Sequence, residues 1–295
     1  MLPRVLCSGS LCCLLLLAAE APPPGALNAF EGAVRIDGVA AGAGQHAIRP
    51  GQVIRTGDGM AELLLAPGAF LRLGGQTEWT FETGRTPGQL NKGEALLEIL
   101  ALPAPLSIEQ NGATIAVRAP GLYDFNRRRG RVTVYSGELQ AERGGKQLTA
   151  GAGFNVAIPR LNKSPAKARA WNALYSWSSL RSAQLSSESK ASAQSYPGGA
   201  ANWHGPAWYW DDLSGSYTFL SASGFVTGPF GWPYYSPGYA PDYFPVPAAS
   251  DSHLYGPPVI ALPNPVTTFE PERGPATPPA VPLTAPGEPR FPGNR

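Results

Sequence analysis

The clearest β pattern in this chain is the stretch Ala61-Glu62-Leu63-Leu64-Leu65-Ala66-Pro67-Gly68-Ala69-Phe70-Leu71-Arg72-Leu73. It holds two mainly apolar runs, Ala61–Leu65 and Ala69–Leu73, separated by a three-residue turn. In that turn Pro67 fixes φ near the value that a turn needs, and Gly68 accepts a positive φ. Short apolar runs bounded by turn residues are typical of strands. The stretch therefore predicts two strands joined by a tight turn.

The same pattern continues towards the C-terminus. Leu106–Glu109 and Thr114–Val117 flank Asn111-Gly112, which is among the strongest short signals for a hairpin. Further on, apolar and polar residues alternate, so Val132 and Val134 share one face of a predicted strand. We count roughly ten such runs with no helical crossover between them, which predicts a sandwich, a barrel or a β-solenoid.

Composition and charge narrow the classes of function. The chain has 295 residues, of which 15% are charged, and a formal net charge of +2. This near balance gives no electrostatic argument for a nucleic-acid partner. The run Arg127-Arg128-Arg129 falls where a turn is expected, and we favour a solvated hairpin tip over a binding patch.

The N-terminus has the pattern of a secretory signal peptide, which we place at residues 1–26. A short basic segment, Met1–Arg4, precedes the apolar run Val5–Ala19, which is too short to span a bilayer comfortably. An uncleaved anchor is the alternative. Ala19-Glu20-Ala21 satisfies the small-residue rule for cleavage, although Pro22 follows it directly.

Cleavage near Ala26 or Ala29 is a further alternative. Cys7, Cys12 and Cys13 all lie in the signal segment, so the mature chain is expected to contain no disulfide and no thiolate metal site. We therefore expect a periplasmic or secreted protein whose mature chain does not span the membrane.

Several short segments follow one another in a fixed order between residues 30 and 158. They are Pro50-Gly51-Gln52-Val53-Ile54-Arg55-Thr56-Gly57-Asp58-Gly59-Met60-Ala61-Glu62-Leu63, Pro67-Gly68-Ala69-Phe70-Leu71-Arg72-Leu73, Gly93-Glu94-Ala95, Ala116-Val117-Arg118, Val132-Thr133-Val134-Tyr135-Ser136-Gly137-Glu138-Leu139 and Leu148-Thr149-Ala150-Gly151. The ordered set resembles the FecR periplasmic domain. The chain departs from that family at Gly121-Leu122-Tyr123-Asp124-Phe125, where the family has a shorter segment, and this departure predicts a reshaped hairpin or a bulge.

The resemblance implies an exported β domain that binds other components of the cell envelope. In regulators of the iron-citrate type, such a domain relays a signal through a transmembrane helix to a cytoplasmic anti-sigma segment. We expect neither of these here, so the resemblance is to the stand-alone exported form. The fold class that follows is mainly β: a FecR-like β-sandwich or β-solenoid domain over residues 30–158, then one α-helix and an aromatic C-terminal region rich in Pro and Gly.

Residues 164–195 are predicted to form a helix followed by a linker. Ser164 is a suitable N-cap, and Pro165 suits the first helical position. One helical face would carry Trp171, Leu174, Trp177, Arg181 and Leu185. We favour packing of this face on the β domain, and a docking helix for a partner is the alternative. Beyond Leu185 the sequence is serine-rich, which predicts a polar linker.

Residues 196–255 form an aromatic region rich in Gly and Pro, and residues 256–295 a Pro-rich tail that we expect to be flexible. The aromatic side chains either pack over the β domain, which we favour, or form stacking platforms for sugars. The candidate residues for binding a partner or ligand are Trp171, Trp177, Trp203, Trp208, Tyr209, Trp210, Trp232, Tyr234 and Tyr235.

The sequence offers no convincing catalytic site. His46, His204 and His253 are far apart in unlike contexts, and the motifs of zinc proteases and of serine hydrolases are both missing. Asp211 and Asp212 could supply paired carboxylates, but adjacent residues of a strand point to opposite faces. We therefore expect no catalytic residue, no cofactor and no metal, and a partner that is either an envelope protein or a cell-wall glycan.

Overall fold

The structure is a computed structural model that describes residues 25–42, 46–102, 104–166 and 172–241. All of these residues belong to one compact unit. Nearly all of the expected signal peptide, the candidate residue Trp171 and the Pro-rich tail lie outside the described residues.

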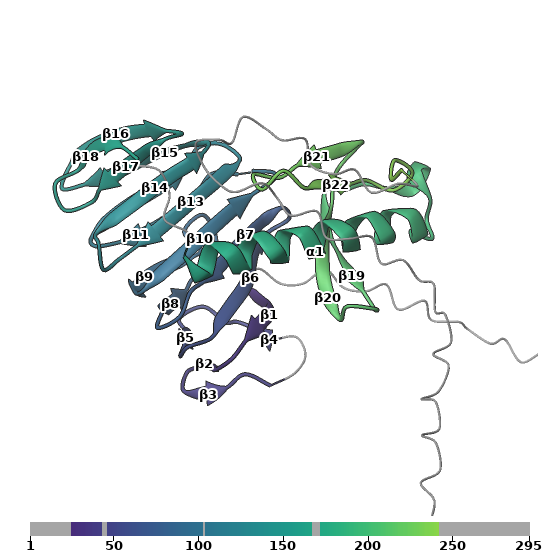
Figure 1. Cartoon of the computed structure of the whole chain (residues 1–295), viewed down its shortest axis with the longest axis horizontal. Coiled ribbons are helices and arrows are strands. Elements are labelled where there is room, and N and C mark those ends of the chain that lie inside the picture. The colour runs from purple at the N-terminus through teal and green to yellow at the C-terminus, as the bar shows by residue number, and fades with distance from the viewer. Residues whose placement is uncertain (1–24, 43–45, 103, 167–171, 242–295) are drawn as a thin grey trace, which may run out of the picture. The chain divides into compact units, whose positions relative to one another are not determined.

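Two nine-stranded sheets, sheet A and sheet B, make up the first part of the described chain (Figure 1). Sheet A contains β1 (Ala26–Glu31), β4 (His46–Ala47), β6 (Met60–Ala66), β7 (Ala69–Leu73), β10 (Glu94–Ile99), β13 (Gly121–Asn126), β14 (Arg131–Ser136), β17 (Phe154–Ala157) and β18 (Asn162–Pro165). Sheet B contains β2 (Val34–Ile36), β3 (Val39–Ala40), β5 (Val53–Thr56), β8 (Glu78–Phe81), β9 (Gly88–Lys92), β11 (Leu106–Gln110), β12 (Ala113–Val117), β15 (Glu138–Arg143) and β16 (Lys146–Gly151). The prediction of a mainly β fold is confirmed.

The chain advances along both sheets in the same direction. Sheet A has the order β18-β17-β14-β13-β10-β7-β6-β1-β4, and sheet B has the order β16-β15-β12-β11-β9-β8-β5-β2-β3. The chain adds a strand or a hairpin to one sheet and then crosses to the other. Each new strand therefore pairs with a recent one, as in a solenoid built from two layers. Only roughly ten strands were expected because short strands such as β3 and β4 carry almost no sequence signal.

Turn chemistry sets the register of the hairpins. Asn111 and Gly112 both have positive φ between β11 and β12, as a two-residue hairpin of this type requires. Gly68 has φ of +83° between β6 and β7. The expected irregularity near Gly121–Phe125 is present, because the register of β13 on β14 shifts between Leu122 and Tyr123.

The main core lies between the two sheets, and sheet A is also covered on its outer face. Leu63 and Leu71 point into the core between the sheets, whereas Leu64 and Phe70 point to the other side. All four are fully buried. A strand buried on both faces reads as a continuous apolar run, which is the pattern of β6 and β7.

The cover begins with helix α1 (Ala173–Ser195), which crosses the outer face of sheet A (Figure 1). The predicted start of this helix was wrong. Ser164 and Pro165 lie in β18, where Ser164 pairs with Asn155 and the edge strand is exposed. The N-cap is Asn172, whose side-chain oxygen accepts a hydrogen bond of 2.8 Å from the Tyr175 amide.

The predicted end of the helix was also wrong, because α1 continues through the serine-rich segment to Ser195. Its inner face carries the buried serines Ser178, Ser182, Ser186, Ser189 and Ser192. Small side chains let the helix approach closely, and most of their hydroxyls meet polar partners, whereas Ser178 Oγ has none among the described residues. Ser186 donates to the Pro233 carbonyl at 2.5 Å, and Ser189 accepts from the Tyr235 amide at 3.0 Å. The serine-rich segment, which was predicted to be a polar linker, therefore forms part of the buried face of α1.

The aromatic region completes the cover. It forms a short 3-10 turn, η1 (Ala200–Asn202), and two hairpins, β19 (Ala207–Asp211) with β20 (Ser216–Leu220) and β21 (Phe225–Thr227) with β22 (Pro233–Tyr235). Phe219 and Tyr234 are fully buried and pack with Phe70 of β7 in one apolar cluster. The favoured interpretation, aromatic side chains packed on the β domain, is confirmed. Among the described residues, no helix has the length and apolar character that crossing a bilayer requires.

Candidate functional site

A cluster of charged side chains lies buried between sheet A and its cover. Glu62, Arg72 and Glu98 come from the neighbouring strands β6, β7 and β10, and all three are fully buried. Arg72 Nε donates to Glu62 Oε2 at 2.8 Å, and Arg72 Nη1 donates to Glu98 Oε2 at 2.6 Å. One guanidinium thus bridges two carboxylates on the outer face of the sheet, where each would otherwise be costly to bury.

Helix α1 contributes the rest of this charge cluster. Arg181 Nε donates to Glu62 Oε1 at 3.1 Å, and Arg181 Nη1 lies 3.8 Å from Glu188 Oε1. The Ser182 hydroxyl donates to Glu98 Oε2 at 2.5 Å. The charge cluster therefore contains Glu62, Arg72, Glu98, Arg181 and Glu188, and it joins the helix to the sheet through directional bonds.

The carboxylates of the charge cluster have different affinities for a proton. Burial alone would raise the pKa of Glu62, but Arg181, Arg72 and the Asn28 amide outweigh it, so that pKa lies below its usual value. Burial raises the pKa of Glu98 above its usual value, because Arg72 and Ser182 compensate only part of the loss of water. The pKa of Glu188 is raised by burial in the same way. Glu62 is therefore the firmly ionised member.

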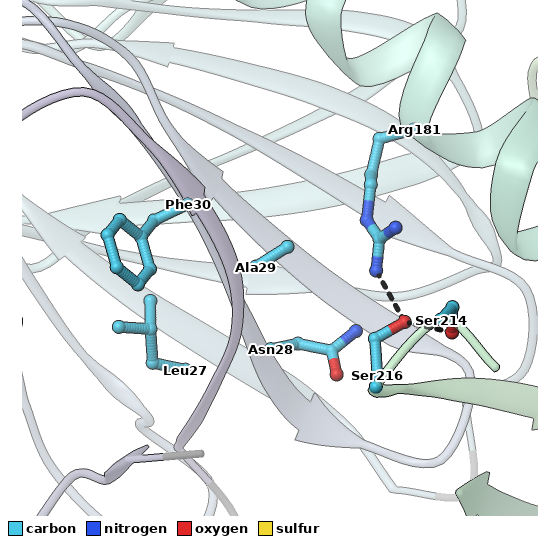
Figure 2. A pocket seen from close by; sticks show the side chains of 8 residues that line it. Leu27, Asn28, Ala29, Phe30, Arg181, Ser214 and Ser216 are labelled. Carbon is cyan, nitrogen blue, oxygen red and sulfur yellow. Dashed lines mark hydrogen bonds between the residues drawn. The ribbon is translucent and has the colours of Figure 1, made fainter. Parts of the chain in front are cut away.

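A polar cavity of about 220 Å³ opens at the edge of the charge cluster (Figure 2). Its walls come from β1, from α1 and from the turn between β19 and β20, and they comprise Leu27, Asn28, Ala29, Phe30, Arg181, Ser214, Gly215 and Ser216. Arg181 Nη2 donates to Ser216 Oγ at 3.1 Å, and the Ser216 hydroxyl donates to Glu188 Oε2 at 3.1 Å. The hydrogen bond between Arg181 and Ser216 is drawn in Figure 2.

Asn28 enters the cavity because of an irregularity in β1. The pairing of β1 with β6 shifts between Leu27 and Ala29, so Asn28 is the extra residue of a bulge. Its amide donates to Glu62 Oε1 and to the Tyr217 carbonyl, both at 2.9 Å, and its oxygen accepts from the Tyr217 amide at 2.8 Å. Asn28 thus ties β1 to both the charge cluster and the cover.

The same stretch of β1 has an open backbone edge. Strand β4 pairs with Ala26 and Leu27 only. Within the described residues, no strand pairs with Ala29–Glu31 on the side away from β6. An open edge presents amide and carbonyl groups to any extended chain that lies alongside. The cavity and the open edge are formed by consecutive residues, so one ligand can use both.

The arrangement is suited to binding a neutral polar group. The charge cluster pairs its two guanidinium groups with its own carboxylates, so none of these charges is left to pair with an ionic ligand. The carboxylates are occupied by Arg72 and Arg181 and do not form a free acid–base pair. A carbonyl, an amide or a hydroxyl can instead bond with the Ser214 hydroxyl and the Arg181 guanidinium.

The predicted binding residues are divided between buried and half-buried positions. Trp208, Trp232, Tyr234 and Tyr235 are buried in the cover. Trp177, Trp203, Tyr209 and Trp210 are half-buried. None of them lines the cavity. Their role in binding stays a prediction.

The histidines and the aspartate pair noted in the sequence are not brought together either. His46 lies in β4 and His204 precedes β19, while His253 lies outside the described residues. Asp211 accepts from the Leu213 amide and Asp212 from the Trp210 indole, so both serve the hairpin turn. In the ranges that the structure describes, no group of His, Cys, Asp and Glu is arranged to hold a metal ion.

Sequence reasoning missed the charge cluster, although the sequence carries a signal for it. Glu62, Arg72 and Glu98 interrupt the most apolar strands of the chain, at positions that should face away from the main core. Complementary charges on adjacent buried strands indicate a paired and covered face. Asn28 had no comparable signal, because its position depends on the bulge. Arg181 was placed on the packing face of the predicted helix, where it is buried, but the sequence did not indicate its partners.

Comparisons with known proteins add little. No protein-family model and no curated protein matches the chain. Two solved structures of a putative anti-sigma factor from Parabacteroides distasonis are similar at 13% and 14% identity, with TM-scores of 0.33 and 0.32. The similarity covers 39% and 38% of this chain and 59% and 58% of those chains. At this TM-score neither likeness supports an inference about function.

The different proton affinities in the charge cluster predict different effects of two similar substitutions. At pH 7 we expect Glu62→Gln to lower the free energy of unfolding by about 3–5 kcal/mol, because it leaves buried guanidinium charge without its partner. Glu98→Gln should cost less, because burial raises the pKa of Glu98 and so reduces what the folded state loses with that negative charge. Urea unfolding measures both values.

The contributions of Glu62 and Glu98 to the free energy of unfolding should depend on pH with opposite signs. The stability from Glu62, whose pKa is lowered, is present above the usual glutamate pKa and is lost as pH falls through the folded value. The stability from Glu98, whose pKa is raised, is present below the usual pKa and is lost as pH rises through the folded value. Glu78→Gln, at the exposed pair with Arg55, is the matched control and should cost about 0–1 kcal/mol. Equal losses for Glu62→Gln and Glu98→Gln would contradict the difference in proton affinity.

Proposed function

We propose that this chain is a non-catalytic binding protein of the cell envelope, whose FecR-like β domain recognises an extended segment of a partner protein. The FecR-like segments support the family part of the proposal, because they fall on successive strands from β5 to β16 in the expected order. Three glycines in these segments, Gly68, Gly93 and Gly137, have positive φ. Glycine adopts a positive φ without steric cost, which explains why the segments have glycine at these turns.

The observation that carries the proposal is the polar cavity beside the open edge of β1. Strand addition supplies affinity through backbone hydrogen bonds, and a pocket beside the added strand supplies specificity. An extended chain paired with Ala29–Glu31 would place a side chain near Asn28 and Ser214. Since the charges of the cluster are already paired with one another, we expect a neutral polar side chain there, such as Asn, Gln or Ser.

Peptide selection with a cavity-filling variant tests this function. The exported protein should enrich extended peptides from a displayed random library, with a neutral polar residue at one position. Ser214→Trp fills the cavity from an exposed turn and should weaken the selected peptides by at least about tenfold, or 1.4 kcal/mol. Ser223→Trp, in the exposed turn after β20, is the control and should bind normally.

The backbone contribution has its own readout. N-methylation of alternate amides in a selected peptide should abolish binding if the peptide pairs with β1, and should matter little if side chains alone bind. The proposal fails if no peptide is enriched, or if Ser214→Trp binds the selected peptides as well as the unmodified protein does.

A glycan is the second candidate ligand, favoured by an exposed aromatic pair. Phe225 and Tyr239 are 51% and 55% exposed, and their rings stack at 6.0 Å between centroids with 20° between planes. Parallel exposed rings suit the apolar face of a sugar. These two residues differ from the aromatic residues predicted from the sequence, most of which are buried or half-buried.

Sedimentation with insoluble peptidoglycan tests the glycan candidate. Phe225→Ala combined with Tyr239→Ala should reduce retention by at least about tenfold, because each ring contributes about 1 kcal/mol. Leu180→Ala combined with Leu213→Ala removes two other exposed apolar side chains and serves as the control. Unchanged retention in the aromatic double variant would remove glycan binding from consideration at this pair.

We also propose export to the periplasm or beyond, with cleavage before Gly25. The Gly25 amide donates to the Leu64 carbonyl at 2.6 Å, and Ala26 and Leu27 are buried. A cut near Ala26 or Ala29 would remove part of a strand that pairs with β6, including Asn28 in the second case. The site Ala19-Glu20-Ala21 leaves β1 intact.

N-terminal sequencing of the protein recovered from the periplasm or medium of an expressing bacterium tests both points. The expected N-terminus lies between residues 20 and 25, close to the small-residue site. A mature N-terminus beyond Ala26 would contradict cleavage before Gly25, and retention of the uncut chain inside the cell would contradict export.

A further inference from the structure

The fold gathers basic side chains from three turns at one end of the β domain. The turn between β13 and β14 carries the arginine triplet and is followed by Arg131, the turn between β15 and β16 is flanked by two further cations, and the turn between β17 and β18 adds one more. We call this set the basic end. It comprises Arg127, Arg128, Arg129, Arg131, Arg143, Lys146 and Arg160.

Hydrogen bonds hold these turns against one another. The Ile158 amide donates to the Gly130 carbonyl at 2.8 Å, which joins the β17–β18 turn to the β13–β14 turn. Arg143 Nη1 donates to the Pro159 carbonyl at 3.0 Å, and its Nε donates to the Asn111 carbonyl at 3.3 Å. The arginine triplet lies at a hairpin tip, as predicted from the sequence, and is one part of a larger surface contributed by both sheets.

The basic end has an excess of positive charge. Glu109 and Glu142 lie on the adjoining strand ends, and Glu94 shares its turn with Lys92, so the seven cations outnumber the nearby carboxylates. The whole chain has a formal net charge of only +2. Positive charge is thus concentrated here and compensated elsewhere, which is the distribution expected of a surface that attracts anions.

The cations of the basic end are not used within the protein as ion pairs. In the part of the chain that the structure describes, ion pairs engage Arg55, Arg72 and Arg181 but none of the seven. Arg128, Arg129, Arg143, Lys146 and Arg160 are exposed, so their charged groups are open to an external acceptor.

The residue types indicate the kind of acceptor. Six of the seven cations are arginines, whose planar guanidinium pairs with phosphate through two parallel hydrogen bonds. Residues 127–131, 143–146 and 158–161 contain no aromatic side chain, so this surface has no platform on which bases or sugar rings could stack. The cations lie on turns of both sheets rather than along one strand. Stacked sheets are about 10 Å apart, so the basic end is a broad surface.

We propose that the basic end docks on a surface of phosphate groups, namely a membrane that contains anionic phospholipid. Clustered Lys and Arg side chains bind such surfaces through the sum of many weak attractions, which salt screens within about 8 Å at physiological ionic strength. None of the seven residues lines the cavity or belongs to the charge cluster. This docking therefore stands independently of the peptide-binding function, and one surface could hold the protein at a membrane while another binds a partner.

Vesicle sedimentation tests the proposal with the exported protein, from which the apolar N-terminal segment has been removed. The protein should sediment with vesicles of phosphatidylcholine and phosphatidylglycerol but not with phosphatidylcholine alone, and high salt should release it. The combined substitutions Arg128→Gln, Arg129→Gln and Arg160→Gln change exposed side chains only and should weaken binding by more than about tenfold.

A matched control removes the same charge elsewhere. Arg35→Gln, Arg49→Gln and Arg118→Gln are also exposed, and together they should leave vesicle binding within about twofold. The proposal is overturned if the unmodified protein ignores anionic vesicles, or if the control triple loses as much binding as the test triple. It is also overturned if single-stranded DNA binds more tightly than the vesicles at equal salt, or if inorganic phosphate alone binds and vesicles do not.

Discussion

The rest of this structure depends on the pairing of Arg72 with Glu62 and Glu98 on the outer face of sheet A. A guanidinium and two carboxylates on that face are tolerable in water and costly when covered without partners. The cover therefore has to bring charges of its own, and helix α1 does so with Arg181 and Glu188. This requirement explains why the helix lies where it does, since an apolar stripe alone would not fix its rotation.

The cover makes the aromatic region part of the β domain's own core. Phe70 of β7 packs edge-on against Trp208 with 4.9 Å between ring centroids, and Trp208 in turn contacts Phe219. Aromatic burial supplies the large apolar area, and the charge cluster supplies direction. The serine face of α1 lets these two layers come close. A region that looks like an appended tail in composition is thus the second half of one hydrophobic structure.

The fold was more predictable from the sequence than the site was. Strand hairpins such as β6–β7 and β11–β12 have local causes, namely apolar runs and turn residues with positive φ, so sequence reasoning found them. Helix α1 was misplaced because Ser164 has the local chemistry of a cap, yet pairing of β18 with β17 competes for it and wins. The cavity depends on Asn28, Arg181 and Ser214, which lie far apart in sequence and meet only through the bulge and the cover.

Covering sheet A also determines where partners can still bind. Its inner face packs on sheet B and its outer face on α1 and the two C-terminal hairpins, so both faces are occupied by the chain itself. Strand edges and turns take no part in this face-to-face packing and stay available, as does the outer face of sheet B, where exposed and buried residues alternate. The open part of β1 is an edge, and the basic end is a set of turns. A two-layer β structure that advances in one direction produces both kinds of surface, so interaction sites at edges and ends are a consequence of its topology.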